Sequence, residues 1–224
     1  GACLSSTEEK LVELSNGCTC CSLREELLLQ VKDLASQGRF DYMIIESTGV
    51  SEPFPVASTF NFRDDNGNSL ADVSRIDTMV TVVDSANLIA NYCSIDFFKE
   101  SENDCFDGKG ERSIVGLLVD QIEFADVIVL NKVDMVSKKD LSIVKGIVRS
   151  LNVKAKMIES NFCKIDVGSV VNTRLFDLEK VQDHPLWAQE LNSSKDHISE
   201  TRKYGIKSFV YRACAPFDPQ ALHA

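Results

Sequence analysis

The sequence is poor in basic residues relative to acidic ones, and it has no long apolar run. Lys and Arg total 24 of the 224 residues against 34 Asp and Glu, so the net charge is -10. Proteins that coat nucleic acid or bind anionic membranes depend on basic surfaces. A membrane-spanning helix requires roughly 18 or more consecutive apolar residues, and no segment approaches that length. We therefore expect neither nucleic acid nor a membrane among the partners.

The amino terminus lacks the features of a secretory leader. Residues 1–10 contain no initiator Met, no basic region and no apolar region. Both ends of the sequence are abrupt, which favours a truncated or processed chain. Of the eight cysteines, three lie within four positions and the rest are scattered, unlike a disulfide scaffold in a short secreted chain. This distribution favours reduced thiols and a cytoplasmic location.

Composition and periodicity predict an α/β fold. Hydrophobic residues make up 44% of the chain and charged residues 26%, which is typical of a globular protein. Apolar segments typical of buried strands alternate with apolar stripes at helical spacing, so we expect a mostly parallel sheet flanked by helices. The predicted strands cover residues 42–46, 78–84, 126–130 and 154–158. The predicted helices contain the stripes at 23–34, 114–125 and 141–151.

Composition also suggests how the chain is divided. Residues 1–188 carry the α/β pattern, and two polar loops at 61–68 and 91–110 are expected to be surface excursions. Residues 189–204 are polar and are predicted to be a linker. After them, residues 206–212 alternate apolar and polar side chains, as a half-exposed strand does. We therefore expect 205–224 to begin a second domain.

The first chemical motif is Asn131-Lys-Val-Asp134, which directly follows the predicted strand 126–130. Ligands of an open parallel sheet bind beyond the carboxyl ends of its strands. A carboxylate there can accept two hydrogen bonds from guanine, through N1–H and the exocyclic amine, whereas adenine offers no such pair. Asn131 can bond the other base edge or tie loops together, and the Lys132 stem can cover the base face. The alternative is a solvated turn, but a capping box at 137–140 opens the next helix and favours guanine binding.

The second motif, Glu46-Ser-Thr-Gly49, ends another predicted strand. An acid at this place can hold a water of Mg²⁺, and a glycine lets the backbone approach a γ-phosphate. The alternative is a plain turn with an exposed acid, and the motif alone does not decide between them. The guanine motif further along the same alternation of strands and helices favours the functional interpretation.

The third motif is a cluster of three thiols, Cys18, Cys20 and Cys21. Thiols this close can converge on one soft metal ion, with Zn²⁺ and Cu(I) as candidates. Ser22-Leu-Arg-Glu25 predicts a capped helix start directly after the cluster, and the positive end of a helix favours the thiolate form. Three ligands suit an open site that passes its metal on. The alternatives are a redox pair and a group of inert buried thiols.

Five segments, in this order and spacing, resemble the CobW-type GTPases, which include the zinc-regulated GTPase metalloprotein activators. The similarity extends from about residue 12 to residue 219, and the Gly-Cys-x-Cys-Cys motif is highly specific to that family. The segments are Asn16–Glu25, Ile45–Pro53, Val82–Asp84, Asp120–Asp126 and Val129–Asp134.

The resemblance implies a P-loop GTPase domain of the SIMIBI-like type over residues 1–188, incomplete at its N-terminus. It implies that GTP binding and hydrolysis are coupled to transfer of zinc, or a related metal, to a client metalloprotein. GTP, Mg²⁺ and Zn²⁺ are the expected ligands. Residues 205–224 resemble the opening of the family's C-terminal domain.

The resemblance also implies roles for single residues. Glu46 would be the acid of the Mg²⁺ and switch region, with Gly49 beside the γ-phosphate. The segment Asn152-Val-Lys-Ala155 resembles the family's later guanine-contacting turn, although Val153 replaces its proline. The complete set of implied site residues is Cys18, Cys20 and Cys21 for the metal, Glu46 and Gly49 for catalysis, and Asn131, Lys132, Asp134, Asn152 and Ala155 for the nucleotide.

The sequence departs from the family in two respects, since it lacks most of the family's C-terminal domain and also its phosphate-binding loop. It contains no Gly-x-x-x-x-Gly-Lys-Ser/Thr loop, whose backbone amides, lysine and hydroxyl hold the phosphates and Mg²⁺. We therefore expect a truncated form of such a GTPase. An alternative is a non-hydrolysing module that buffers zinc or binds a client. A thiol redox protein is a third hypothesis, disfavoured because no thioredoxin-like context surrounds the cysteines.

Overall fold

The computed structural model describes a central part of the chain. The described residues are 21–47, 49, 51–60, 63, 67, 69–93 and 114–177. Cys18 and Cys20, the predicted linker 189–204 and the predicted second domain at 205–224 lie outside them. The division into domains therefore stays a prediction.

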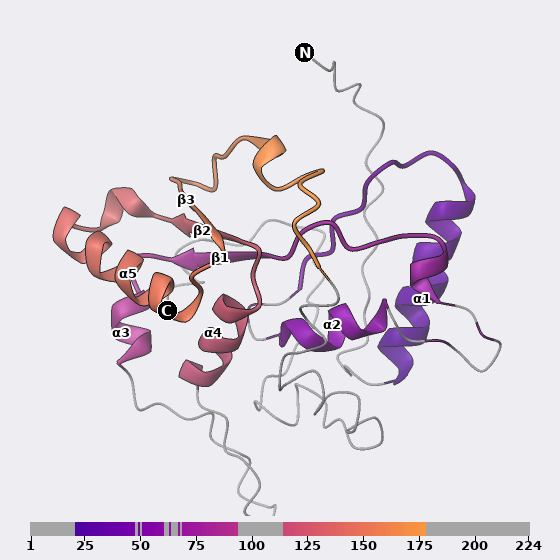
Figure 1. The fold of residues 1–224 in the computed structure, drawn as a ribbon, viewed down its shortest axis with the longest axis horizontal. Coiled ribbons are helices and arrows are strands. Elements are labelled where there is room, and N and C mark those ends of the chain that lie inside the picture. The colour runs from indigo at the N-terminus through magenta and orange to yellow at the C-terminus, as the bar shows by residue number, and fades with distance from the viewer. Residues whose placement is uncertain are drawn as a thin grey trace, which may run out of the picture.

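Three parallel strands form the sheet, in the order β1-β2-β3 (Figure 1). They are β1 (Val80–Asp84), β2 (Val127–Asn131) and β3 (Lys156–Glu159). The register pairs Val80 with Val127 and Val127 with Lys156, so the carboxyl ends of all three strands meet at one edge. The predicted parallel α/β sheet is confirmed, and three of its four predicted strands are present.

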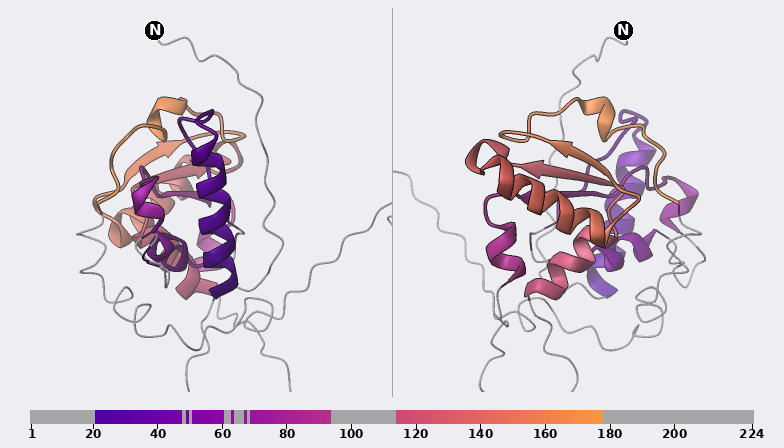
Figure 2. Two further views of the ribbon diagram at one scale, coloured as in Figure 1. Left: turned by 90° about the vertical axis from the view of Figure 1, so that its right-hand side faces the viewer. Right: turned by 60° about the vertical axis from the view of Figure 1, so that its left-hand side comes forward.

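Helices α3 (Leu88–Tyr92), α4 (Ile114–Glu123) and α5 (Lys138–Leu151) pack on one face of this sheet (Figure 2). Both crossovers advance in the same direction across the sheet, and right-handed crossovers of that kind place their helices on the same face. Ile128 and Leu130 of β2 point into this core and are completely buried. The buried residues of the core are Val83, Leu88, Ile122, Ala125, Ile128, Leu130, Val144, Val148 and Ala155.

Helix α5 begins as its sequence predicts. The Ser137 hydroxyl accepts a hydrogen bond from the Asp140 amide at 3.1 Å and donates one to the Asp140 carboxylate at 2.7 Å. The bond from the Asp140 amide satisfies one of the backbone amides that the first turn of a helix leaves without a partner. Val144 and Val148, four residues apart, share one helix face and are both fully buried. The predicted helix and its Ser137 N-cap are confirmed, whereas the Asp140 carboxylate bonds to the Ser137 hydroxyl and not to its backbone amide, so the predicted capping box is only half formed.

A second group of elements lies beside the sheet, with α1 (Cys21–Ser36), α2 (Pro53–Thr59) and the 3-10 turn η1 (Leu70–Asp72). Leu27 and Val31 of the predicted stripe are buried against Phe60 and Leu70. Helix α1 is described from Cys21 onward, and the side chains of Ser22 and Glu25, which would form the predicted capping box, lie outside what the structure describes. Within the described ranges, no helix is both long and apolar enough to span a lipid bilayer.

The predicted strand at 42–46 is wrong. The segment has no regular secondary structure, and Ile44 and Ile45 are 79% and 37% exposed. A strand is stable only where a neighbour completes its hydrogen-bond ladder, and no described segment pairs with 42–46. The segment is held instead by a side chain, because the Tyr42 hydroxyl donates to the Asp77 carboxylate at 3.0 Å.

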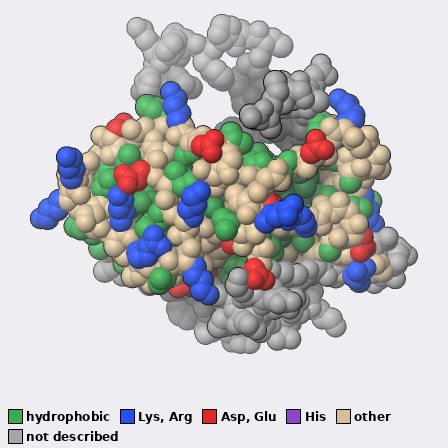
Figure 3. Space-filling model, turned by 45° about the horizontal axis from the view of Figure 1, so that its top comes forward, with side chains coloured by type: hydrophobic (Ala, Val, Ile, Leu, Met, Phe, Trp, Pro, Cys, Tyr) green, Lys and Arg blue, Asp and Glu red, His purple; other side chains and the backbone are tan. Residues whose placement is uncertain are grey.

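Strand β1, which the sequence predicts to be a buried strand, is covered on one face only. Val83 faces the helices and is 6% exposed, whereas Val80 and Val82 face away and are 42% and 57% exposed. In β2, by contrast, the residues on both faces are buried. Figure 3 shows one side of the molecule, where apolar side chains lie scattered among Lys, Arg, Asp and Glu rather than in one continuous patch.

Candidate functional site

The predicted guanine motif lies at the carboxyl edge of the sheet. Asn131 is the last residue of β2, and it lies in register with Asp84, the last residue of β1. The chain then forms the 3-10 turn η2 (Val133–Met135), which contains Asp134. The Asp134 side chain is exposed, and no described residue hydrogen-bonds to its carboxylate. That carboxylate is thus available to the N1–H and amine of a base at the ligand-binding edge of the sheet.

Lys132 has an unusual backbone conformation at this edge. Its φ of +61° is in the left-handed region, which residues other than glycine and asparagine rarely adopt. The Lys132 ammonium donates to the Asp84 carboxylate at 2.7 Å. Burial raises the pKa of Asp84, but hydrogen bonds from Lys132, Asn87 and the Ala86 amide outweigh that effect and lower the pKa below its usual value. Asp84 is therefore a charged partner for Lys132 at neutral pH.

A loop that the sequence motifs did not identify completes this edge. It follows β3 at residues 160–163, beside the loop that follows β2. The Asn131 side-chain oxygen accepts hydrogen bonds from the Ser160 hydroxyl at 3.1 Å and the Cys163 amide at 2.9 Å. The Asn161 side-chain oxygen accepts one from the Asp134 amide at 3.0 Å. Asn131 therefore ties the two loops together, which is one of the two roles predicted for it.

Asn152 and Ala155 lie at the opposite edge of the sheet. They precede β3, at the amino end of the strand, whereas the guanine motif follows the carboxyl end of β2. Asn152 is 8% exposed, and its amide nitrogen donates to the carbonyl oxygens of Ile122, Glu123 and Ala125 at 2.8–3.1 Å. Its side-chain oxygen accepts from the amides of Lys154 and Ala155 at 3.1 and 2.9 Å. The structure does not bring Asn152 and Ala155 to Asn131, Lys132 and Asp134.

Glu46 and Gly49 also lie away from the guanine motif. Glu46 is exposed, and Gly49 lies in a turn. The Gln121 side chain of α4 donates to the carbonyl oxygens of Gly49 and Ser51, each at 3.0 Å. The Gln121 backbone oxygen in turn accepts from the Thr81 hydroxyl near the start of β1. The turn is thus held near the amino ends of the strands, and the structure does not bring it to the carboxyl edge.

The cysteine cluster is at the border of the described residues. Cys21 is the first residue of α1, and its side chain, like Cys18 and Cys20, is outside what the structure describes. Elsewhere in the described ranges, no group of His, Cys, Asp and Glu could hold a metal ion. Cys93 and Cys163 are free and exposed. The metal assignment therefore rests on the sequence motif.

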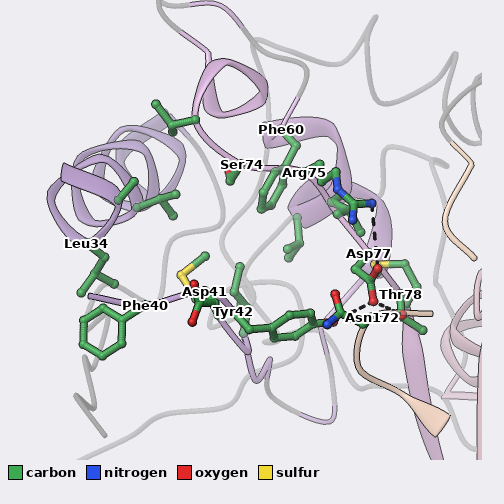
Figure 4. Close-up of a pocket in the computed structure, with 18 residues that line it drawn as sticks. Leu34, Phe40, Asp41, Tyr42, Phe60, Ser74, Arg75, Asp77, Thr78 and Asn172 are labelled. Carbon is green, nitrogen blue, oxygen red and sulfur yellow. Dashed lines mark hydrogen bonds and ion pairs between the residues drawn. The ribbon is translucent and has the colours of Figure 1, made fainter. Parts of the chain in front are cut away.

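A cavity of about 360 Å³ lies between the second half of α1, residues 40–45 and residues 73–79 (Figure 4). One wall is polar around Asp77, whose carboxylate accepts from Tyr42, Thr78 and the amides of Thr173 and Arg174. The site residues predicted from the sequence are absent from its lining. Asp77 links the segments at 42 and 173 to the start of β1, so we assign it a structural role.

We expect Asp77 to make the fold sensitive to acid. It is 7% exposed, and although burial raises its pKa, hydrogen bonds from Arg174, Thr78, Thr173 and Tyr42 lower the pKa overall. A lowered pKa stabilises the fold above the unfolded-state value of about 4, and this stabilisation is lost as the pH falls through the folded-state value. Urea unfolding between pH 7 and pH 3 should show stability falling below about pH 4. Asp77→Asn should lower stability by about 1–3 kcal/mol at pH 7 and should flatten this pH dependence.

Two results would separate this explanation from a general effect of acid. Asp166→Asn removes a carboxylate that is exposed and makes no capping hydrogen bond, so it should leave the pH dependence unchanged. An equal fall in stability with pH for wild type and Asp77→Asn would contradict the role of Asp77.

Comparison with known proteins identifies a family. The family model described as "CobW/HypB/UreG, nucleotide-binding domain" matches residues 1–159. The zinc-regulated GTPase metalloprotein activator 1 of Dictyostelium discoideum is 44% identical over 215 residues, which are 96% of this chain and 45% of that protein. The protein of the same name from Schizosaccharomyces pombe is 30% identical over 96% of this chain and 44% of its own length. The zinc chaperone CobW of a Sinorhizobium species is 33% identical, over 96% of this chain and 60% of its own length.

These similarities cover nearly the whole chain and much less of each relative. The chain spans about half the length of the curated relatives that it matches. No solved structure matches the chain significantly.

Proposed function

The chain belongs to the CobW/HypB/UreG nucleotide-binding family, as the sequence motifs predicted, and from this membership we propose that it acts in GTP-dependent delivery of zinc to a client metalloprotein. GTP binding would favour a zinc-loaded state that is competent to bind the client. Hydrolysis would then release the zinc, which is cargo rather than a resident cofactor. The names of the relatives support this proposal, since they describe zinc-regulated GTPase activators and zinc chaperones.

The observation that carries the proposal is the exposed Asp134 carboxylate at the carboxyl edge of a parallel sheet. Its backbone is fixed by Asn161, and the neighbouring Asn131 is fixed by the loop at 160–163. A carboxylate on a fixed backbone can accept both guanine donors without first ordering its loop, so less entropy is lost on binding. Adenine would leave the carboxylate unpaired, which makes guanine the preferred base.

We assign the zinc to the thiolates of Cys18, Cys20 and Cys21. The thiolate is the form that binds metal, and the positive end of a helix such as α1, which begins at Cys21, favours the thiolate form of thiols beside it. Three ligands leave a position open, through which a client ligand can take the ion. Reduced thiols are needed for this role, and we propose a cytoplasmic location for that reason.

We assign Mg²⁺ and the γ-phosphate to Glu46 and Gly49, which is the role that the family motif implies for them. Glu46 is an exposed carboxylate, the kind of ligand that Mg²⁺ or its waters prefer. In the structure both residues lie away from the guanine edge, so this assignment rests on the motif Glu46-Ser-Thr-Gly49.

The experiment is a zinc titration of the full-length protein against a chromophoric chelator, with a non-hydrolysable GTP analogue or with GDP. We expect different zinc affinities in the two nucleotide states. Cys20→Ser should lower the zinc affinity by at least about 10²-fold in either state, because a hydroxyl remains protonated where a thiolate binds Zn²⁺ strongly.

The matched control is Cys93→Ser, which changes an exposed thiol outside the cluster and should leave zinc affinity unaltered. Zinc affinity unchanged by Cys20→Ser would refute the ligand assignment. Equal zinc affinities with the GTP analogue and GDP would refute the coupling and support the alternative, a module that buffers zinc or binds a client without hydrolysis.

A further inference from the structure

Asp84 is the last residue of β1, and neither the guanine motif nor the metal motif assigns it a role. It lies opposite Asn131 in the register of β1 and β2, at the edge where the base is expected. We propose that Asp84 is a positioning residue of the guanine site, which holds the Lys132 side chain across the place where the base binds. This inference rests on the proposed binding of a guanine nucleotide.

The Asp84 carboxylate is fixed before any ligand arrives. One oxygen accepts a hydrogen bond from the Ala86 amide at 3.0 Å, and the other accepts one from the Asn87 side chain at 2.9 Å. The turn at residues 85–87 thus sets the direction of the carboxylate. The following residue is also attached to β2, because the Ser85 amide donates to the Asn131 carbonyl oxygen at 3.0 Å.

Lys132 is directed toward this carboxylate by its own backbone. Its φ of +61° turns the chain sharply at the end of β2, and its ammonium lies 2.7 Å from the Asp84 carboxylate. With the ammonium held at β1 and the backbone held at β2, the four methylene groups of the side chain lie between the two strand ends. Such a stem offers an apolar surface to the flat face of a base.

The ion pair between Lys132 and Asp84 is too exposed to contribute much to the stability of the fold, so stability does not explain its presence. The side chains of Lys132 and Asp84 are 45% and 32% exposed, and exposed pairs contribute little to folding. A left-handed backbone at a lysine is moreover unfavourable. An unfavourable conformation that orients one side chain is typical of a binding site.

The test is a double-mutant cycle on GDP affinity in the full-length protein, with Asp84→Asn, Lys132→Met and the double variant. Each single change should weaken GDP binding by about three- to tenfold, the cost of ordering one long side chain at binding or of losing its contact. The double variant should bind no worse than Lys132→Met, because Asp84 acts through Lys132. Inosine diphosphate lacks the amine that donates a hydrogen bond to Asp134. Each variant should weaken the binding of inosine diphosphate by the same factor as the binding of GDP.

Glu159→Gln is the matched control, since it breaks a similarly exposed ion pair between Glu159 of β3 and Lys145 of α5 and should leave GDP affinity unchanged. Additive losses in the double variant, or an Asp84→Asn variant that binds GDP like wild type, would overturn the inference. Failure of the wild-type protein to bind GDP would instead refute the proposed function, and the inference with it.

Acylation of Lys132 in the nucleotide-free protein, followed by mass spectrometry, tests the inference independently of nucleotide binding. Asp84→Asn should increase the acylation rate of Lys132 several-fold, because the side chain is no longer held against the carboxylate. An unchanged rate would overturn the inference even if GDP binds.

Discussion

Replacing Asn152 by Ala should lower the free energy of unfolding by about 3–5 kcal/mol. The side chain is 8% exposed and makes hydrogen bonds with both its amide nitrogen and its oxygen. Alanine would leave the Ala125 carbonyl and the Ala155 amide without these partners, each at a cost of about 1–3 kcal/mol. Urea unfolding followed by circular dichroism measures the loss.

We expect so large an effect because Asn152 supplies hydrogen-bond donors to the end of α4. The last four carbonyl groups of a helix have no partner within the helix and must find one elsewhere. Asn152 supplies a donor to Ile122 and Glu123 of α4 and to Ala125 of the following turn, and Thr81 supplies one to Gln121. One side chain thus joins the end of α4 to the turn between α5 and β3.

Two further variants test this explanation. Asn152→Asp keeps the size of the side chain but places an oxygen against the three carbonyl groups, so it should be as destabilising as alanine. Asn87→Ala removes one exposed hydrogen bond and should change stability by less than about 1 kcal/mol. A stable Asn152→Ala protein with weakened guanine binding would contradict this explanation and support the nucleotide role that the family motif implies for Asn152.

The parts of the fold that the sequence predicts correctly have local causes. β2 is an uninterrupted apolar segment, and a strand of that kind is buried whichever elements cover it. Helix α5 combines an apolar stripe with a capping serine, and both features act within a few residues. The position of residues 131–134 at the carboxyl edge of the sheet is predictable for a similar reason, since the rule for parallel sheets depends on one strand and the residues that follow it.

The parts that sequence reasoning missed depend on distant neighbours. Residues 42–46 have the composition of a buried strand, but a strand also needs a hydrogen-bonding partner, which composition does not show. The hydrogen-bond partners of Asn152, 27–30 residues away, likewise could not be predicted from the residues around it. The loop at 160–163 could have been found, because it follows the carboxyl end of β3 as residues 132–134 follow that of β2.

Asp134→Asn in the full-length protein should lower the affinity for GTP by on the order of 10³-fold and reduce the preference for GTP over ATP. The carboxylate can accept from both N1–H and the amine of guanine, whereas the asparagine amide group offers a donor in one of those positions. Two donors then face each other, and the base binds poorly. Competition between labelled GTP and unlabelled GTP or ATP measures both effects.

The same change should create a new preference, which separates loss of recognition from loss of structure. Xanthosine triphosphate carries a carbonyl oxygen in place of the guanine amine, so the asparagine of the variant can donate to it while accepting from N1–H. We therefore expect Asp134→Asn to bind xanthosine triphosphate more tightly than GTP, with the order reversed in wild type. Asp134 is exposed, and its backbone amide, not its carboxylate, holds the loop through Asn161, so the fold should survive the change. Unaltered selectivity among the three nucleotides would show that the base is not recognised at this edge of the sheet.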